Sequence, residues 1–136
     1  MSPVPTKLGV FFGYFKPCPD TPNCVSSQAT RAGQKIDPIS FAGVDRAIAY
    51  QVLSEVIAEM PRAEVLVSRI DYIHVEFRSF VFGFLDDTEF ALNDTAGRIE
   101  VRSASRLGKG DGGTNRKRVE EIRTKFNAKI NDLLKR

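Results

Sequence analysis

The chain has 136 residues, of which 42% are hydrophobic and 27% are charged, and its formal net charge is +3. This length fits one domain, and the composition is too apolar for a disordered chain and too mixed for a membrane protein. The apolar run at residues 8–15 is interrupted by Gly9 and Gly13 and is far shorter than the roughly 20 residues that a transmembrane helix needs. We therefore expect one folded domain without a transmembrane segment.

The start of the chain also lacks the features of a secretory signal, because Lys7 is the only basic residue before the aromatic-rich stretch. We therefore expect a cytoplasmic protein, either free or peripheral to a membrane complex. In a reducing compartment Cys18 and Cys24 are expected to be two thiols, although the short loop between them also permits a disulfide. Their spacing matches neither a zinc site nor a redox motif, and we expect no metal ion or other cofactor.

Positive charge is concentrated near the C-terminus. Residues 1–97 carry 8 basic and 12 acidic groups, whereas residues 98–136 carry 12 basic and 5 acidic groups, so the second part has a net charge of +7. Such a segment can attract nucleic acid, acidic lipid or an acidic protein surface, or it can be the solvated face of a helix. No nucleic-acid-binding motif accompanies the basic residues, so we do not expect a nucleic-acid partner.

The first 37 residues are rich in Pro, Gly, Ser, Asn and Thr, which predicts an irregular N-terminal arm that belongs to the same domain. Residues 38–136 are expected to contain a helix, antiparallel strands and a second helix. Asp37 as N-cap and Pro38 at the first helical position predict where the first helix begins, and Pro61 predicts its end. The aromatic side chains expected to anchor the arm on the domain are Phe11, Phe12, Tyr14 and Phe15.

In residues 64–105 apolar residues recur with a period of two, which predicts antiparallel strands. A tight turn at residues 94–97 pairs Asn93 with Arg98 and sets the register of the last hairpin. A slip by one residue would place apolar side chains opposite charged ones. The cross-strand pairs that this register predicts are Leu92 with Ile99, Phe90 with Val101, and Glu89 with Arg102.

A glycine-containing loop follows, and then apolar residues spaced by three or four positions predict a second amphipathic helix. Its predicted apolar stripe is Val119, Ile122, Phe126, Ile130 and Leu133. The order of elements predicts an α+β fold, with a single antiparallel sheet of about four or more strands and two helices packed on one face.

Polar residues around the glycine loop form the first candidate site. Free N–H groups at a helix start and nearby arginines can hold an anion, although the glycine spacing is not that of a Walker A loop. In the competing structural interpretation, Arg102 and Arg106 pair with carboxylates of the sheet while Asp111 caps the loop. The hypothetical ligand-binding residues are Arg102, Ser103, Ser105, Arg106, Asp111, Asn115 and Arg116.

Three carboxylates form the second cluster. Alternation along a strand places Asp87 and Glu89 on one face and Asp86 on the other. They can hold a hard cation or act as an acid and base, but cross-strand pairing with arginines is the favoured role. His74, the single histidine, lies on the polar face of its strand and is interpreted as a surface or network residue.

The third cluster is the loop at residues 18–27, where two prolines restrict the backbone. This loop can seat Asn23 and Ser26 for hydrogen bonding, with Cys18 and Cys24 as its other marked residues. One histidine and two cysteines do not assemble into a catalytic triad or a metal-ligand set. We therefore assign no catalytic residue, and whether the protein is an enzyme stays open with a non-catalytic role favoured.

These motifs together resemble the "domain of unknown function 1499" family over nearly the whole chain. Residues 8–10 with Gly13, residues 18–28, 83–90 and 102–108, and positions 111, 113 and 115–118 carry the resemblance. The chain departs from the family pattern at Gly110, Gly112 and Thr114, which implies a looser loop there. The resemblance implies a fold and a set of motif residues, but no reaction and no substrate, because the family has no established activity.

We expect a non-catalytic binding or assembly module whose partner is another protein, as in a subunit of a larger complex. This expectation rests on the missing catalytic set and on the basic, amphipathic C-terminal third. The alternative is an enzyme or small-ligand binder that recognises an anionic group through residues 102–118. A convergent pocket at those residues would favour the alternative. The ligand and the oligomeric state do not follow from the sequence.

Overall fold

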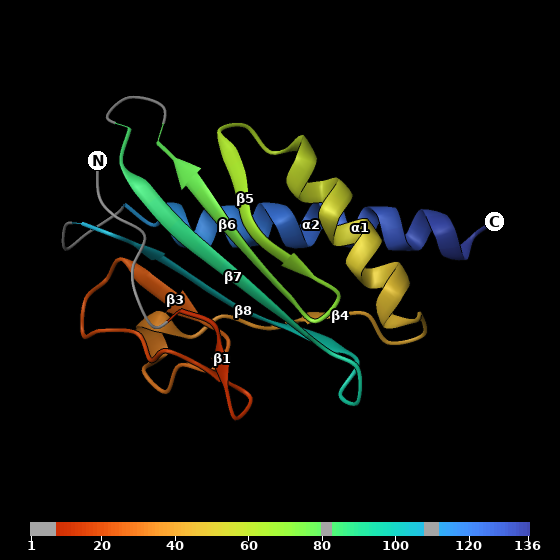
Figure 1. The fold of residues 1–136 in the computed structure, drawn as a ribbon, viewed down its shortest axis with the longest axis horizontal. Helices are drawn as coiled ribbons and strands as arrows, with labels where there is room; N and C mark the ends of the chain where they lie inside the picture. Colours follow the sequence, from red (N-terminus) through yellow and green to blue (C-terminus); the bar gives the residue numbers. More distant parts are fainter. Residues whose placement is uncertain (1–7, 80–82, 108–111) are drawn as a thin grey trace.

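The computed structural model describes residues 8–79, 83–107 and 112–136. It contains two α-helices and a large antiparallel sheet (Figure 1). In chain order the elements are β1 (Val10–Phe11), β2 (Tyr14–Phe15), β3 (Cys24–Ser26), a 3-10 turn (Ala32–Gln34), β4 (Ile39–Ser40), α1 (Arg46–Glu59), β5 (Ala63–Arg69), β6 (Tyr72–Arg78), β7 (Leu85–Asn93), β8 (Arg98–Ser105) and α2 (Thr114–Leu134).

The main sheet has six strands and follows the order β3-β8-β7-β6-β5. The short strand β4 also pairs with β8, so β3 and β4 share one edge of that strand while β5 forms the opposite edge of the sheet. All of these strand pairs are antiparallel. The first two strands form a separate hairpin in the N-terminal arm.

Both helices pack on one face of the sheet and share one hydrophobic core with it. Figure 1 shows the two helices crossing beside the strands, and they are in contact. Alternate residues of β6, β7 and β8, such as Val75, Phe90 and Val101, face this layer and are fully buried. Burying each such side chain contributes on the order of 1.5 to 3 kcal/mol. The predicted α+β fold with two helices on one face is confirmed.

The predicted register of the last hairpin is also confirmed. Leu92 lies opposite Ile99 and Phe90 lies opposite Val101, on the face that packs against the helices. The same register pairs Glu89 with Arg102 and places both side chains on the opposite face of the sheet. At these three pairs the register therefore places the apolar side chains on the helix side of the sheet and the charged pair on the opposite face.

The predicted start of the first helix at Pro38 is wrong. The segment Ile39–Ser40 is the strand β4, and α1 begins only at Arg46. The φ angle of proline suits an extended chain as well as a helix, and burial of Ile39 against β8 outweighs the local helix-start signal. The carbonyl of Asp37, the expected N-cap, instead accepts a hydrogen bond from Arg123 at 2.5 Å.

The second helix confirms the predicted amphipathic pattern except at its end. Val119, Ile122 and Phe126 have no exposed surface, whereas Leu133 is 39% exposed. The last turns of α2 extend past the end of the sheet, so they have no sheet to pack on (Figure 1). Within the described residues no helix combines the length and apolar character needed to cross a bilayer.

The expectation of two free thiols is wrong, because Cys18 and Cys24 form a disulfide. Closing a loop this short stabilises a folded chain by about 2 kcal/mol in the chain-entropy account. The bond ties Cys18, in the middle of the N-terminal arm, to Cys24, the first residue of β3. It therefore limits how far the residues before Cys18 can move from the sheet.

Candidate functional site

The face of the sheet away from the helices carries buried charged side chains. Glu89 has no exposed surface, and Asp87 and Arg102 are also buried. Charges removed from water must be paired or hydrogen-bonded. The residues of this charged face are Tyr72, His74, Glu76, Asp87, Glu89, Arg102 and Arg106.

Glu89 is the centre of the first group on this face. Its Oε2 accepts hydrogen bonds from the Tyr72 hydroxyl at 2.5 Å and from the Gly9 backbone N–H at 2.7 Å. Its Oε1 lies 3.7 Å from Arg102 Nη1 and accepts no hydrogen bond from the described part of the chain. Burial and the adjacent carboxylate raise the pKa of Tyr72 above its ordinary value, so Tyr72 remains a neutral donor.

Asp87 is the centre of the second group. Arg106 donates from Nε to Oδ2 at 2.8 Å and from Nη2 to Oδ1 at 2.9 Å, and it also pairs with Glu76 at 2.7 Å. His74 Nε2 lies 2.7 Å from Asp87 Oδ1, so this histidine is a buried network residue. Burial acts to raise the pKa of Asp87, but the hydrogen bonds from Arg106 and His74 outweigh it, and the pKa lies below its ordinary value.

On the helix side of the sheet, Asn115 ties α2 to β8. Its Oδ1 accepts a hydrogen bond from Ser103 Oγ at 2.6 Å, and its Nδ2 donates to Ser105 Oγ at 3.1 Å. The same Nδ2 donates to the Asn23 carbonyl at 3.2 Å. Asn115 has no exposed surface, so its amide acts as a fixed structural bridge between α2, β8 and the loop of the N-terminal arm.

Two arginines at the start of α2 also contact the protein itself. Arg118 Nη1 lies 2.9 Å from Asp86 Oδ2, across the helix–sheet interface. Arg116 donates to the backbone carbonyls of Gly33 and Lys35, both at 3.1 Å. Part of the basic charge near the C-terminus is therefore used within the fold.

The loop closed by the disulfide is held by several short hydrogen bonds. Gln34 Nε2 donates to the carbonyls of Pro19 and Thr21 at 2.6 and 2.9 Å. Thr21 Oγ1 donates to Asn23 Oδ1 at 2.6 Å, and Ser26 Oγ accepts a backbone N–H at 3.1 Å. These contacts fix Asn23 and Ser26 within the loop.

The predicted site residues divide among separate groups, which are Glu89 with Arg102, Asp87 with Arg106, and Asn115 with Ser103, Ser105 and Asn23. Asp86 instead pairs with Arg118, and Arg116 contacts backbone carbonyls. Asp111 lies outside the described residues. Tyr72 and Glu76 also belong to the charged face and were not predicted from the sequence. Period-two alternation in β6 was the signal that could have found them, because it places both residues on the face of His74.

The N-terminal arm is fixed to the charged face mainly through its backbone. In addition to the bond from the Gly9 N–H, the Lys16 carbonyl accepts a hydrogen bond from Arg102 Nε at 2.8 Å. The Gln28 side chain accepts from the Phe15 N–H at 2.9 Å and donates to a carbonyl of the β1–β2 turn at 2.8 Å. Phe15 is buried at 5% exposure. These contacts hold the arm in one position on the sheet.

The hairpin formed by β1 and β2, residues 10–15, presents aromatic side chains to solvent, and we call it the aromatic hairpin. The expectation that four aromatic residues anchor the arm is wrong for three of them. Phe11 is 60% exposed, Phe12 is 102% exposed and Tyr14 is 67% exposed, while only Phe15 packs inside. The molecule therefore exposes three large aromatic side chains on a short hairpin, which Phe15 and the backbone contacts of the arm fix to the sheet.

Phe12 also has an unusual backbone conformation. Phe11 pairs with Tyr14, so Phe12 and Gly13 form a two-residue loop, and their φ angles are +54° and +87°. A type I′ hairpin requires positive φ at both loop positions, which are normally occupied by Asn, Asp or Gly. A bulky residue in this conformation is a genuine outlier. Neither burial nor local conformational preference accounts for a phenylalanine here.

A hollow of about 440 Å³ adjoins the aromatic hairpin. An ion pair between Arg31 Nη1 and Asp20 Oδ1, 3.2 Å apart, lies beside it. The residues that line the hollow are Tyr14, Phe15, Lys16, Pro17, Cys18, Ser26, Gln28, Ala29, Thr30, Arg31 and Gln34. A projecting apolar hairpin and a hollow with a mixed polar and apolar lining therefore lie side by side on this surface.

One protein family matches the chain. Its model, described as a protein of unknown function (DUF1499), matches residues 14–126. No curated protein and no solved structure matches the chain. Within the described residues, no group of three or more His, Cys, Asp or Glu side chains is placed to hold a metal ion.

Proposed function

Because the chain belongs to the DUF1499 family, which is described only as a protein of unknown function, we propose its role from the geometry of the molecule. We propose that it is a non-catalytic module that binds another protein through the aromatic hairpin, as a subunit of a larger complex. The family membership confirms the resemblance found in the sequence motifs, but it supplies no activity.

The observation that carries this proposal is the position of Phe12. Its side chain is fully exposed, and its backbone adopts a conformation that costs of order 1 to 3 kcal/mol for a residue other than glycine. Strained residues of this kind concentrate at functional sites, and clustered exposed apolar residues mark interaction surfaces. Phe and Tyr are enriched at the cores of protein interfaces, where they supply much of the binding free energy.

The surroundings of the aromatic hairpin favour a protein partner over a lipid bilayer. A shaped surface with a hollow and an ion pair beside the apolar residues suits a partner of complementary shape. A membrane-binding surface would instead combine apolar residues with several free basic side chains. Lys35 donates to the Ser27 carbonyl at 2.6 Å and Arg31 pairs with Asp20, so among the described cations around the hollow only Lys16 has neither an ion pair nor a side-chain hydrogen bond.

The alternative, a small anionic ligand held by residues 102–118, has less support. Arg102 and Arg106 direct their guanidinium groups to Glu89, Asp87 and the arm, and Arg116 contacts backbone carbonyls. An anion would have to compete with these buried partners. We therefore rank this alternative, and an enzymatic activity built on it, second.

The cytoplasmic location expected from the sequence stays a prediction. The disulfide between Cys18 and Cys24 argues against it, because disulfides persist in oxidising compartments and are rare in the cytosol. We propose that the protein functions in a compartment that is oxidising enough to maintain this disulfide. Alkylation of thiols before cell lysis, followed by mass spectrometry, reports the state of the two cysteines.

The proposal is tested by purifying the protein at its natural level from its own cells under mild detergent. Mass spectrometry should identify a stoichiometric partner with the unchanged chain, and the Phe11→Ser variant should lose it because the apolar contact is removed. Ile70→Ser is the matched control, since Ile70 is also exposed but lies on the β5–β6 turn. A chain that purifies free, or the same partner with all three proteins, would contradict the proposal.

A further inference from the structure

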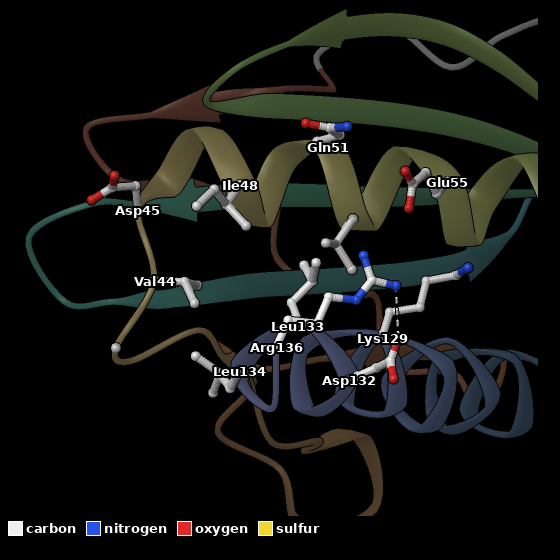
Figure 2. Close-up of a pocket in the computed structure, with 12 residues that line it drawn as sticks. Val44, Asp45, Ile48, Gln51, Glu55, Lys129, Asp132, Leu133, Leu134 and Arg136 are labelled. Carbon is white, nitrogen blue, oxygen red and sulfur yellow. Dashed lines mark hydrogen bonds and ion pairs between the residues drawn. The ribbon is translucent and has the colours of Figure 1, made fainter.

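A second surface lies on the helix layer, in a groove of about 720 Å³ between α1 and the end of α2. Figure 2 shows Ile48 on α1 and Leu133 on α2 pointing into the space between the two helices. Val44, Ile48 and Val52 follow one another at intervals of four residues and form the apolar wall on the side of α1. The groove is therefore a trough that runs along α1, with an apolar wall on that side and a wall of leucines and charged residues on the side of α2.

The apolar lining of the groove stays largely open to solvent. Ile48 is 40% exposed, Leu133 is 39% exposed and Leu134 is 59% exposed. Sites for small molecules enclose most of their ligand's surface. Side chains this open on both walls would leave a small ligand in contact with water. An elongated apolar surface is a better match for the trough.

Within the described residues, the basic residues at the rim of the groove already have ion-pair partners, whereas two of its acidic residues do not. Lys129 pairs with Glu59 at 2.9 Å and Arg136 pairs with Asp132 at 3.2 Å, so the basic residues of α2 already have acidic partners. Asp45 and Glu55 are exposed, and neither lies within ion-pair distance of a described cation, although Lys129, already paired with Glu59, also attracts Glu55 electrostatically. Figure 2 shows these two carboxylates near opposite ends of the groove, along α1.

We propose that this groove binds an amphipathic α-helix of a partner protein. The apolar face of that helix packs between Ile48 and Leu133, and basic residues near its two ends face Asp45 and Glu55. Asp45 and Glu55 are separated by ten positions, or about 15 Å along α1. Basic residues about 11 positions apart lie on one face of a helix at a similar separation. The inference rests on the groove alone and does not depend on the aromatic hairpin.

Fluorescence anisotropy with synthetic peptides tests this inference. The probe is a labelled helical peptide of about 18 residues, with a leucine stripe at the i, i+3, i+4 and i+7 spacing and two lysines about 11 positions apart. Two control peptides have the same length: one scrambles the leucine positions, and the other replaces both lysines with glutamate. The unchanged protein should bind the probe at least about tenfold more tightly than either control.

Two protein variants separate the apolar and charged contributions. Leu134→Ser should weaken probe binding by about fivefold or more at any salt concentration, because it removes an exposed apolar contact. The double variant Asp45→Lys with Glu55→Lys should weaken binding strongly at about 50 mM salt and much less at about 500 mM salt. Phe11→Ser should bind like the unchanged protein, which separates this groove from the aromatic hairpin.

Three results would overturn the inference. They are no binding of the probe, equal binding of all three peptides, and unchanged affinity in both groove variants. Flotation with phosphatidylcholine vesicles is the remaining measurement. Lipid binding that is lost in Leu134→Ser would identify the groove as a membrane contact instead.

Discussion

Asp87→Asn should lower the free energy of unfolding by about 3 kcal/mol at neutral pH, because removing one member of a buried ion pair leaves an uncompensated charge. Arg106 makes two hydrogen bonds to this carboxylate, and the side chains of both residues are 3% exposed. Glu76 remains beside Arg106 in the variant, so the loss falls at the lower end of the range for such substitutions. Urea or guanidinium unfolding of the purified proteins measures the difference.

The matched control is Asp71→Asn, which makes the same chemical change in an exposed ion pair with Arg69. It should change the free energy of unfolding by less than about 1 kcal/mol. Because the pKa of Asp87 is lowered in the folded protein, its stabilisation is complete above the ordinary carboxyl value of 3.8 and is lost as the pH falls through the lowered value. The difference in the free energy of unfolding between Asp87→Asn and the unchanged protein should therefore become smaller below about pH 4. A difference that stays constant with pH would contradict the ion-pair explanation.

Phe12→Asn should weaken partner binding by about 30-fold or more while raising the free energy of unfolding by about 1 kcal/mol. The binding loss follows because Phe12 is the most exposed aromatic side chain of the hairpin. The gain in stability follows because asparagine tolerates the positive φ of this loop position, whereas phenylalanine does not. The two effects have opposite signs, which distinguishes a binding residue from a structural one.

Thermal unfolding gives the stability change for Phe12→Asn, and quantitative mass spectrometry of the purified complex gives the retained fraction of partner. Ile70→Asn serves as the control, because Ile70 is 46% exposed and φ is not positive there. It should change neither quantity appreciably. A Phe12→Asn protein that is both less stable and fully bound to its partner would show that Phe12 serves the fold.

The side-chain facing and the register of the sheet were predictable because both depend on residues that are close together in the sequence. Apolar alternation fixes which face each side chain takes, and one tight turn then sets the pairing of Phe90 with Val101. The same alternation correctly separated Asp86 from Asp87 and Glu89. The start of α1 failed because Ile39 pairs with a strand far along the chain, and no local signal reports that contact.

The candidate site was less predictable for a different reason. Hydrophobicity indicates that a residue can be buried, but it does not show whether that residue lies in the core of the chain or is exposed on its surface. Phe15 is buried and Phe12 is fully exposed, although both belong to the same aromatic stretch. The disulfide between Cys18 and Cys24 was the less favoured of two alternatives, because a reducing compartment was expected and the short loop alone permits the bond without requiring it.

The proposed binding role of the aromatic hairpin is tested most directly by photo-cross-linking in living cells. A benzophenone amino acid replaces Phe12 in one protein and Ile70 in a second, and both positions are exposed in the unbound chain. We predict one discrete protein adduct from position 12 that is absent from position 70. No adduct from position 12, adducts with lipid alone, or the same adducts from both positions would contradict the account.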